Sequence, residues 1–212
     1  LLKNSPDLLN DVSSGISLLM WAVQRNQPKV TKFLLEQGAN PNLRSPNDEN
    51  RTPLYRAVLA GSQPMIELLV TNRADINSGS NDGSPLRYAA KSGNVSIVAL
   101  LLKLGAKIDY PDWSSPLPAA AQIGHRTIVE LLLAKGANPN ANNGYEFNTS
   151  LHLAAQANYR SVAEVLLAGG GNVNATNRLA QTPLHLAAQS NHLAVAELLI
   201  ARGARIDATD EK

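Results

Sequence analysis

The sequence repeats itself at intervals of a little over thirty residues. The phrase Thr-Pro-Leu-His at 182–185 has close counterparts that begin at Thr52, Ser84 and Ser115, and weaker ones that begin at Ser17 and Thr149. The six starts are separated by 35, 32, 31, 34 and 33 residues. A second phrase returns in step with the first, as in Leu-Leu-Ala-Lys-Gly-Ala-Asn at 132–138. Two linked phrases at one fixed period predict a stack of similar structural units.

Each phrase has a physical reason. A Ser or Thr before Pro is typical of a helix start, because its hydroxyl accepts an unpaired backbone N–H and Pro has no N–H to lose there. The apolar residues that follow predict a short first helix, and those at 128–133 recur at helical spacing and predict a second helix. A Gly or Asn separates the two helices and a Gly ends the second, where a left-handed backbone is expected. Expected first helices lie near 18–25, 53–60, 85–92, 116–123, 150–157 and 183–190.

These residues resemble the ankyrin repeat family, which has the same period and the same Thr-Pro-Leu-His signature. The resemblance covers nearly the whole chain. It implies an all-α solenoid of six helix-turn-helix repeats, with hairpin-like loops that project at roughly a right angle. It also implies a concave groove lined by loops and first helices, with second helices on the convex back. Because no single repeat buries its apolar face alone, stability comes from neighbouring repeats.

Repeat boundaries follow from the two phrases. The opening residues, with Leu1, Leu2 and Asp7, resemble the end of a preceding repeat, and the last residues resemble the opening of a next loop, so we expect a segment of a longer protein. The predicted ranges are 1–10 (end of a truncated preceding repeat), 11–43, 44–78, 79–109, 110–141, 142–175 and 176–212 (the last ankyrin repeat and the start of the next loop).

Three departures from the pattern carry specific expectations. Arg73 stands where other repeats have Gly, which should cost the second repeat about 1 kcal/mol. The loop from Asn42 to Thr52 is long and polar and is expected to be mobile. The loop from Asp109 to Ser115 is short, contains Pro111, and is expected to be tight.

Composition narrows the function classes. Nineteen Lys and Arg against seventeen Asp and Glu give a formal net charge of +2, too small to indicate nucleic acid or membranes by itself. Without cysteine the chain has neither disulfides nor thiolate metal sites. No apolar run approaches the roughly 18 residues of a membrane helix. We expect an intracellular, cytoplasmic monomer with no cofactor, no metal, no bound nucleic acid and no membrane insertion.

The histidines predict structure rather than catalysis. His152 and His185 share one slot after the helix start, where the family's imidazole bonds near the Thr, and His125 and His192 share another at the start of second helices. No HExxH, CxxC, GxSxG or phosphate-loop motif occurs. Gly169–Gly171 ends a helix instead of beginning one, so its dipole is wrong for an anion. We therefore predict no catalytic residues and no enzyme.

Function is expected at positions that the repeat does not dictate. The first such group is basic and comes from repeats one to three: Arg25, Arg51, Arg56, Arg87 and Lys91. One interpretation is an ordinary solvated surface. The other is a groove that prefers an acidic segment of a partner, with Arg56, Arg87 and Lys91 as contacts.

The second group is aromatic. Tyr110 and Trp113 lie in one loop, and Tyr145 and Phe147 lie in the next. Exposed rings are the anchors that protein interfaces use, although these could instead cover the loop ends. If they are anchors, the two loops form one apolar ledge, extended by Ile123 on the exposed side of its first helix.

The leading hypothesis is a non-enzymatic protein-protein interaction scaffold that binds a partner protein or peptide on its concave face, within a larger multidomain protein. The alternatives are a targeting module of a multidomain enzyme and a nucleic-acid or nucleotide binder, since Arg and aromatic side chains also stack on bases.

Overall fold

The computed structural model describes residues 9–12, 15–110 and 113–210, and over these ranges it contains twelve α-helices and no extended strand. Consecutive helices form six pairs, which confirms the all-α, six-repeat solenoid fold predicted from the sequence. The observed first helices agree with the expected ranges to within one residue. The first helices are α2 (Leu18–Gln24), α4 (Pro53–Leu59), α6 (Pro85–Lys91), α8 (Pro116–Ile123), α10 (Ser150–Gln156) and α12 (Pro183–Gln189). The second helices are α3 (Pro28–Glu36), α5 (Gln63–Thr71), α7 (Val95–Lys103), α9 (Arg126–Ala134), α11 (Arg160–Ala168) and α13 (Leu193–Ala201).

Leu1, Leu2 and Asp7, on which the predicted truncated repeat depends, lie outside the described residues, as do the last two residues of the predicted next loop. The repeat boundaries stay predictions.

The chain divides into two compact units. The first consists of residues up to Ala89 together with Ser96–Ala106, and the second consists of Ala90–Val95 together with the residues from Lys107 on. Helices α2 to α5 therefore belong to the first unit and α8 to α13 to the second, whereas the division runs through the third helix pair.

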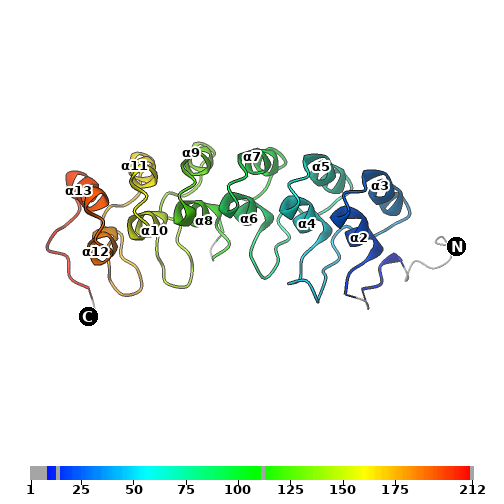
Figure 1. Cartoon of the computed structure of the whole chain (residues 1–212), viewed down its shortest axis with the longest axis horizontal. Coiled ribbons are helices and arrows are strands. Elements are labelled where there is room, and N and C mark those ends of the chain that lie inside the picture. Colours follow the sequence, from blue (N-terminus) through cyan, green and yellow to red (C-terminus); the bar gives the residue numbers. More distant parts are fainter. Residues whose placement is uncertain (1–8, 13–14, 111–112, 211–212) are drawn as a thin grey trace. The chain divides into compact units, whose positions relative to one another are not determined.

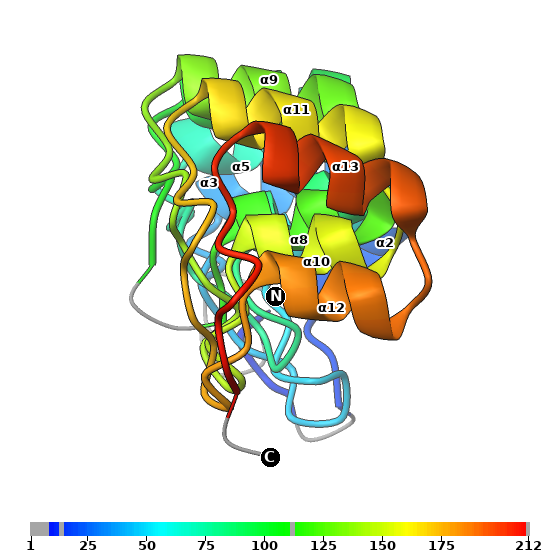
Figure 2. The ribbon, with the colours of Figure 1, turned by 90° about the vertical axis from the view of Figure 1, so that its left-hand side faces the viewer.

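Each unit places its first helices in one row and its second helices in another. In the second unit α8, α10 and α12 follow one another, with α9, α11 and α13 beside them (Figures 1 and 2). Helix α10 packs against α8, α12 and its own partner α11. The long loops leave the first-helix row on the side away from the second helices (Figure 1). Loops and first helices therefore share one face of each unit.

Small and aliphatic side chains at equivalent positions make the core of the second unit. Ala120, Ala154 and Ala187 of the first helices are fully buried, as are the leucines of the second helices, Leu132, Leu166 and Leu199. Alanine lets neighbouring first helices approach closely, while leucine fills the space between pairs at a density close to that of an organic crystal. Each repeat covers the apolar side of the next, as a solenoid requires.

Hydroxyl caps begin the first helices, with one exception. Ser17 and Thr52 each accept the backbone N–H three residues on, and His152 and His185 complete capping boxes with their threonines. The sequence predicts the same capping role for Ser115, and that prediction is wrong. Its hydroxyl donates to the Tyr110 carbonyl at 2.9 Å and accepts the Tyr110 N–H at 3.1 Å. The short loop uses this hydroxyl to close itself, as a tight loop needs, instead of capping α8.

The residues that end the second helices adopt the expected left-handed backbone. Gly136 and Gly203 have φ of 90° and 87°, and no atom lies within 4 Å of the Cβ that a substitution would add. Arg73 occupies the same position with φ 69°. The second repeat therefore carries the left-handed strain of a side-chain-bearing residue.

Asparagines fasten consecutive loops together. The Asn174 amide donates to the Gly203 carbonyl at 3.1 Å while its oxygen accepts the Arg205 N–H at 2.9 Å. Asn42 and Asn140, in earlier repeats, each make the same two bonds to the segment after the next second helix. These side chains satisfy backbone groups that helix ends leave unpaired.

Candidate interaction surface

The histidines all serve the backbone, as predicted. His152 is buried, its Nδ1 faces the Thr149 hydroxyl at 2.8 Å, and its Nε2 donates to the Gln181 carbonyl at 2.8 Å. Burial lowers the pKa of His152, although the bond to Gln181 opposes that shift. A Thr–His pair resembles a nucleophile with its base, but here the imidazole also caps the helix and ties it to the next loop.

The two remaining histidines begin second helices and reach back one repeat. His125 Nε2 donates to the Lys91 carbonyl at 3.1 Å, and His192 Nδ1 donates to the Ala155 carbonyl at 3.0 Å. Both contacts lie within the second unit. Each ring is occupied in joining neighbouring helix pairs.

Among the described residues, no group of three or more His, Asp or Glu side chains is arranged to hold a metal ion. In the same ranges no helix has the length and apolar character needed to cross a membrane.

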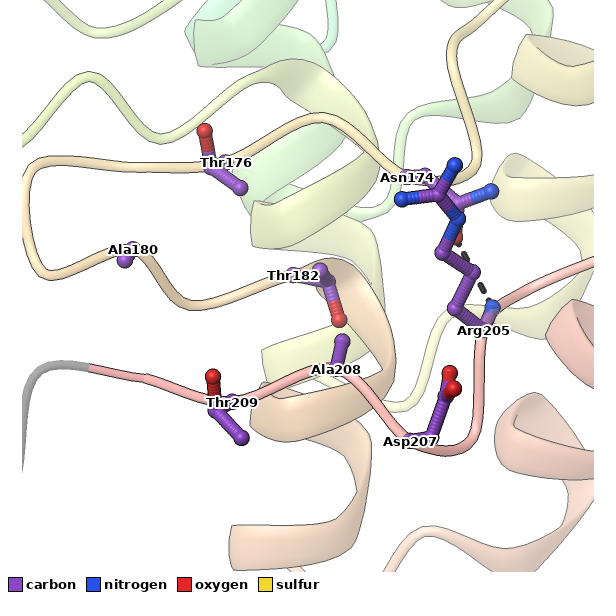
Figure 3. A pocket seen from close by; sticks show the side chains of 8 residues that line it. All are labelled: Asn174, Thr176, Ala180, Thr182, Arg205, Asp207, Ala208 and Thr209. Atoms are coloured by element: carbon purple, nitrogen blue, oxygen red, sulfur yellow. Dashed lines mark hydrogen bonds between the residues drawn. The ribbon is translucent and has the colours of Figure 1, made fainter.

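A hollow of about 590 Å³ lies between the loop before α12 and the segment after α13. Figure 3 shows its lining: Thr176, Ala180 and Thr182 lie along one segment and Ala208 and Thr209 along the other, while Asn174, Arg205 and Asp207 lie at one end. The Thr182 hydroxyl already faces His185 Nδ1 at 2.9 Å, and Asn174 holds the Arg205 backbone. This arrangement serves loop packing and gives no activated nucleophile.

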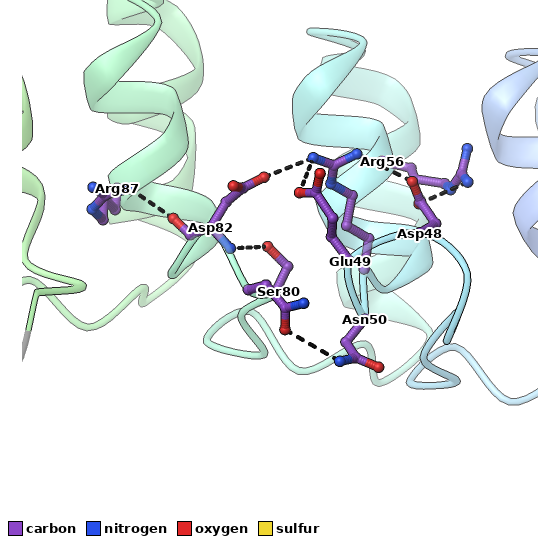
Figure 4. Close-up of polar contacts among 9 residues, drawn as sticks. Asp48, Glu49, Asn50, Arg56, Ser80, Asp82 and Arg87 are labelled. Atoms are coloured by element: carbon purple, nitrogen blue, oxygen red, sulfur yellow. Dashed lines mark hydrogen bonds and ion pairs between the residues drawn. The ribbon is translucent and has the colours of Figure 1, made fainter.

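Two basic residues of the first unit, Arg51 and Arg56, form a charged cluster with acidic residues of neighbouring loops (Figure 4). We call Asp48, Glu49, Arg51, Arg56 and Asp82 the charged clamp. Arg51 contacts Asp48 at 3.1 Å, Glu49 at 2.5 Å and Asp82 at 2.6 Å, and Arg56 contacts Asp48 at 2.7 Å. The clamp joins the loop before α4 to the loop before α6.

The neighbouring charges of the clamp shift the pKa values of its own side chains. Burial alone would lower the pKa of Arg51, but its bond to Asp82 and the charges of Asp48 and Glu49 raise it above the ordinary value. A hydrogen bond with Asp82 raises the pKa of Glu49. The Arg51 guanidinium also lies 5.8 Å from the centre of the buried Tyr55 ring, whose pKa burial raises.

The long loop before α4 makes several contacts with the next loop. Residues 42–52 were expected to be mobile, yet Arg51 ties them to Asp82, and Arg44 donates to the Asn50 and Gly79 carbonyls at 3.3 and 2.8 Å. Opposite charges within this loop and on Asp82 of the next loop thus hold its polar residues together, and the mobility of the loop stays a prediction.

The predicted basic contacts therefore differ in availability. Arg56 is paired with Asp48, and Arg87 is half-buried and donates to the Asp82 carbonyl at 2.6 Å (Figure 4). Burial lowers the pKa of Arg87. Lys91 has an exposed side chain and lies in the second unit. Their part in partner binding stays a prediction.

The predicted aromatic contacts all lie in the second unit. Tyr145 is 81% exposed and Phe147 51%, while Trp113 and Ile123 are each 41% exposed. Tyr110 is partly exposed, and its ring lies 5.1 Å from the Lys107 ammonium. Pro111 lies outside the described residues. Phe147 has φ 56°, a strained backbone for a bulky residue and a kind of strain that often marks functional sites.

A second hollow, of about 350 Å³, lies where Tyr145 meets the following loop. Its apolar wall consists of Tyr145, Leu179 and Leu186, and Gln156 and Gln189 extend it along the first helices. The remaining lining residues are Glu146, Asn148, Asn177, Arg178 and Gln181. Tyr145 thus shares a hollow with the loop after it, and its predicted ledge with Tyr110 and Trp113 of the preceding loop stays a prediction.

Of the residues that line this hollow, only Tyr145 was predicted from the sequence as a contact. Gln156, Arg178, Leu179 and Gln189 are among those that were not. Leu179 is 47% exposed at a loop tip, which is the same signal that singled out the aromatic residues. Gln156 and Gln189 occupy one slot at the ends of α10 and α12, so a comparison of repeats slot by slot could have found them.

Six helix pairs with polar loops on one face define a helical-repeat protein. The family model for ankyrin repeats (3 copies) matches residues 1–80, 19–112, 74–143 and 117–210. The chain belongs to the ankyrin repeat family. Ankyrin repeats are in general non-enzymatic modules of protein-protein interaction.

Proteins of several kinds are similar to this chain. The ankyrin repeat domain of human ASB11 superposes with a TM-score of 0.77 at 30% identity, over 92% of this chain and 87% of that one. Human transient receptor potential cation channel subfamily A member 1 is 36% identical over 107 residues, 49% of this chain and 9% of the channel subunit. The probable 26S proteasome regulatory subunit p28 of Saccharomyces cerevisiae is 34% identical over 110 residues, 50% of this chain and 47% of that subunit. Alignments with these two proteins thus span less than half of their lengths.

Proposed function

We propose that this chain is a non-enzymatic binding module that holds a partner protein on the loop and first-helix face of its second unit. The observation that carries the proposal is the exposure of Tyr145, Phe147, Trp113 and Ile123 on that one face. Large apolar side chains that stay exposed bury little area in the fold, whereas at interfaces such side chains supply most of the binding energy. The cytoplasmic location and the membership of a larger protein stay predictions.

Charge supports a protein partner over nucleic acid. Arg51 and Arg56 are neutralised by acidic residues of their own loops, so they add little to a phosphate-binding surface. Lys91 is the exposed basic residue among the predicted contacts of the second unit, and we assign it to an acidic group at the rim. Rim charges act mainly on the association rate and its salt dependence.

The partner is identified by placing a photoreactive amino acid at Phe147, cross-linking in a cell lysate, and determining the captured protein by mass spectrometry. Binding of that purified protein is then titrated against variants whose melting curves match the unsubstituted chain. Trp113→Ala should weaken binding at least about thirtyfold as a lost anchor, while Lys91→Ala should mainly flatten its salt dependence.

The matched control is Leu193→Ser, which removes an apolar side chain that is 70% exposed on a second helix, away from this face. Normal binding by folded Trp113→Ala and Tyr145→Ala variants would show that the rings only cover loop ends. A steep loss of affinity with salt that no aromatic substitution changes would favour the nucleic-acid alternative.

A further inference from the structure

Some polar side chains that line the 350 Å³ hollow are hydrogen-bonded to one another, and others are not. Its polar floor is internally satisfied: Asn148 accepts the Asn177 amide at 2.8 Å and donates to Glu146 at 2.6 Å, and Gln181 donates to Asp210 at 3.3 Å. Asn148 and Gln181 are both buried. This floor is rigid and has little hydrogen-bonding capacity left for a ligand.

Gln156 and Gln189 are different. Both are exposed at the ends of α10 and α12, and within the described chain neither side chain makes a hydrogen bond. A carboxamide offers donors and an acceptor side by side, which matches the N–H and C=O of a peptide group. Two free carboxamides in one hollow therefore favour a ligand with an unpaired backbone, that is, an extended peptide instead of a helix.

The spacing fits such a peptide. Neighbouring packed helices lie about 8–10 Å apart, and an extended chain advances about 3.3 Å per residue. An extended peptide that crosses from α10 to α12 would therefore meet the next glutamine after about three residues. The side chains between the two contacts alternate in direction, so one of them points into the hollow.

The apolar and charged groups set the side-chain preference. Tyr145, Leu179 and Leu186 form the apolar wall, with Leu179 47% exposed and ready to cover an aliphatic group. The Arg178 guanidinium, at the same rim, makes no ion pair or hydrogen bond with any described residue. Glu146, which also lines the hollow, accepts the Asn148 amide two residues further along the same loop. The charged group without a hydrogen-bond partner next to the apolar wall is therefore the Arg178 guanidinium.

We infer that this hollow binds an extended peptide segment of a partner protein, with one aliphatic side chain against Tyr145 and Leu179 and an acidic side chain on Arg178. The inference rests on the proposed function and makes it specific: Gln156 and Gln189 pair with the peptide backbone, and the side chains between them select the sequence.

The test uses a phage-displayed library of random nine-residue peptides, selected on the purified full chain. Enriched peptides should share an aliphatic residue with Asp or Glu within two positions of it. Tyr145→Ala and Leu179→Ser should each weaken a selected synthetic peptide about tenfold or more. Arg178→Gln should remove the preference for the acidic residue, so that peptides with and without it bind alike.

Controls match each change in kind. Leu193→Ser removes a leucine outside the hollow that is 70% exposed, more than the 47% of Leu179. Gln24→Ala removes the exposed glutamine at the end of α2 in the first unit. Both should bind the peptide as the unsubstituted chain does. In NMR spectra the side-chain amide signals of Gln156 and Gln189 should shift on addition of the peptide, and that of Gln24 should stay.

Two results would overturn the inference: selected peptides without the aliphatic and acidic pair, or peptides that bind Tyr145→Ala and Leu179→Ser normally. If, at the same time, the cross-linked partner protein still depends on Trp113 and Tyr145, the proposed function stands and only the peptide mode is wrong. If the partner also ignores these substitutions, both proposals fail.

Discussion

The loops before α4 and α6 in the first unit and the loops before α10 and α12 in the second have one backbone plan and opposite chemistry. In the first pair the Asn81 N–H donates to the Glu49 carbonyl at 2.9 Å, and in the second the Arg178 N–H donates to the Glu146 carbonyl at 2.9 Å. Side chains add an ion pair, Arg51 with Asp82, between the first two loops and an amide hydrogen bond, Asn177 with Asn148, between the second two.

This difference determines which loops leave large side chains exposed at their tips. In the charged clamp, the cationic side chains turn inward to their own carboxylates, and Arg51 is only 20% exposed. In the second pair, Asn148 and Asn177 complete the fastening below the loop tips, so Tyr145 and Leu179 stay outside. The repeat fixes where loops meet, and the residues that fasten them determine what is left for a partner.

Breaking the ionic fastening should have the largest effect. Arg51→Met leaves three carboxylates without their shared partner. Because Arg51 and Asp48 are each only 20% exposed, we expect a loss of about 2–3 kcal/mol in the free energy of unfolding. The loss stays below that of a fully buried pair because Glu49 and Asp82 are about half exposed. The loss should shrink in high salt. Urea unfolding at low and high ionic strength measures both.

The control for this variant is Arg126→Met. Arg126 pairs with Glu130 one helical turn away, with both side chains about half exposed, and its loss should cost less than about 0.5 kcal/mol. An equally small effect for Arg51→Met would mean that the charged clamp follows the loop backbone instead of stabilising it.

The amide fastening should be nearly as strong but indifferent to salt. Asn148→Ala removes the acceptor of the Asn177 amide in a buried setting, which should cost about 2 kcal/mol. Asn81→Ala, which removes an exposed amide contact with Asn50, should cost about 0.5 kcal/mol or less and serves as the control. A salt-dependent loss for Asn148→Ala would contradict the distinction between the two fastenings.

The sequence was sufficient for the helices because each repeat supplies the same local rules six times. Thr before Pro, alanines on the first helix and Gly after the second are short-range signals, and the helices follow them to within a residue. Ser115 shows where these local rules fail. The loop before it is two residues shorter than the loop before Thr182, and this brings Tyr110 within reach of the hydroxyl that was expected to cap α8.

The interaction surface was less predictable because its contacts join residues about one repeat apart. Arg51 and Asp82 are 31 positions apart at slots that the repeat leaves variable, so nothing local indicates their pairing. Tyr145 and Leu179 meet only because consecutive loops are stacked. Single residues could be chosen by type and exposure, whereas their partners needed the register between loops.

Acid should weaken the second unit's fastening selectively. His152 bonds the Gln181 carbonyl, whereas the first unit has Tyr55 at the same slot. Since burial holds the folded-state pKa of His152 below its ordinary 6.5, the unfolded chain binds the proton first as the pH falls through 6.5. Stability that is fully present above this pH is then lost, by at most about 1.4 kcal/mol per pH unit.

Thermal melting between pH 7.5 and pH 5 tests this, as the His152→Gln variant should lose less stability over that window than the unsubstituted chain. His192→Gln is the control, because that ring lies nearer the surface and begins a second helix. Identical pH profiles for His152→Gln and the unsubstituted chain would assign the acid sensitivity to other groups.

The smallest expected effect concerns the one helix end at which the first unit departs from the common plan. Arg73 holds φ 69°, which Gly adopts without strain, and its carbonyl accepts the Asn42 amide at 3.0 Å, a backbone contact that any residue provides. Arg73→Gly should therefore keep the loop fastening and raise the free energy of unfolding by up to about 1 kcal/mol, offset in part by the greater freedom of Gly in the unfolded chain. The reverse change, Gly136→Arg in the second unit, meets open space and should cost a similar amount through the backbone alone. If Arg73→Gly instead destabilises the chain, the arginine side chain itself stabilises the second repeat, and the left-handed backbone is not its weak point.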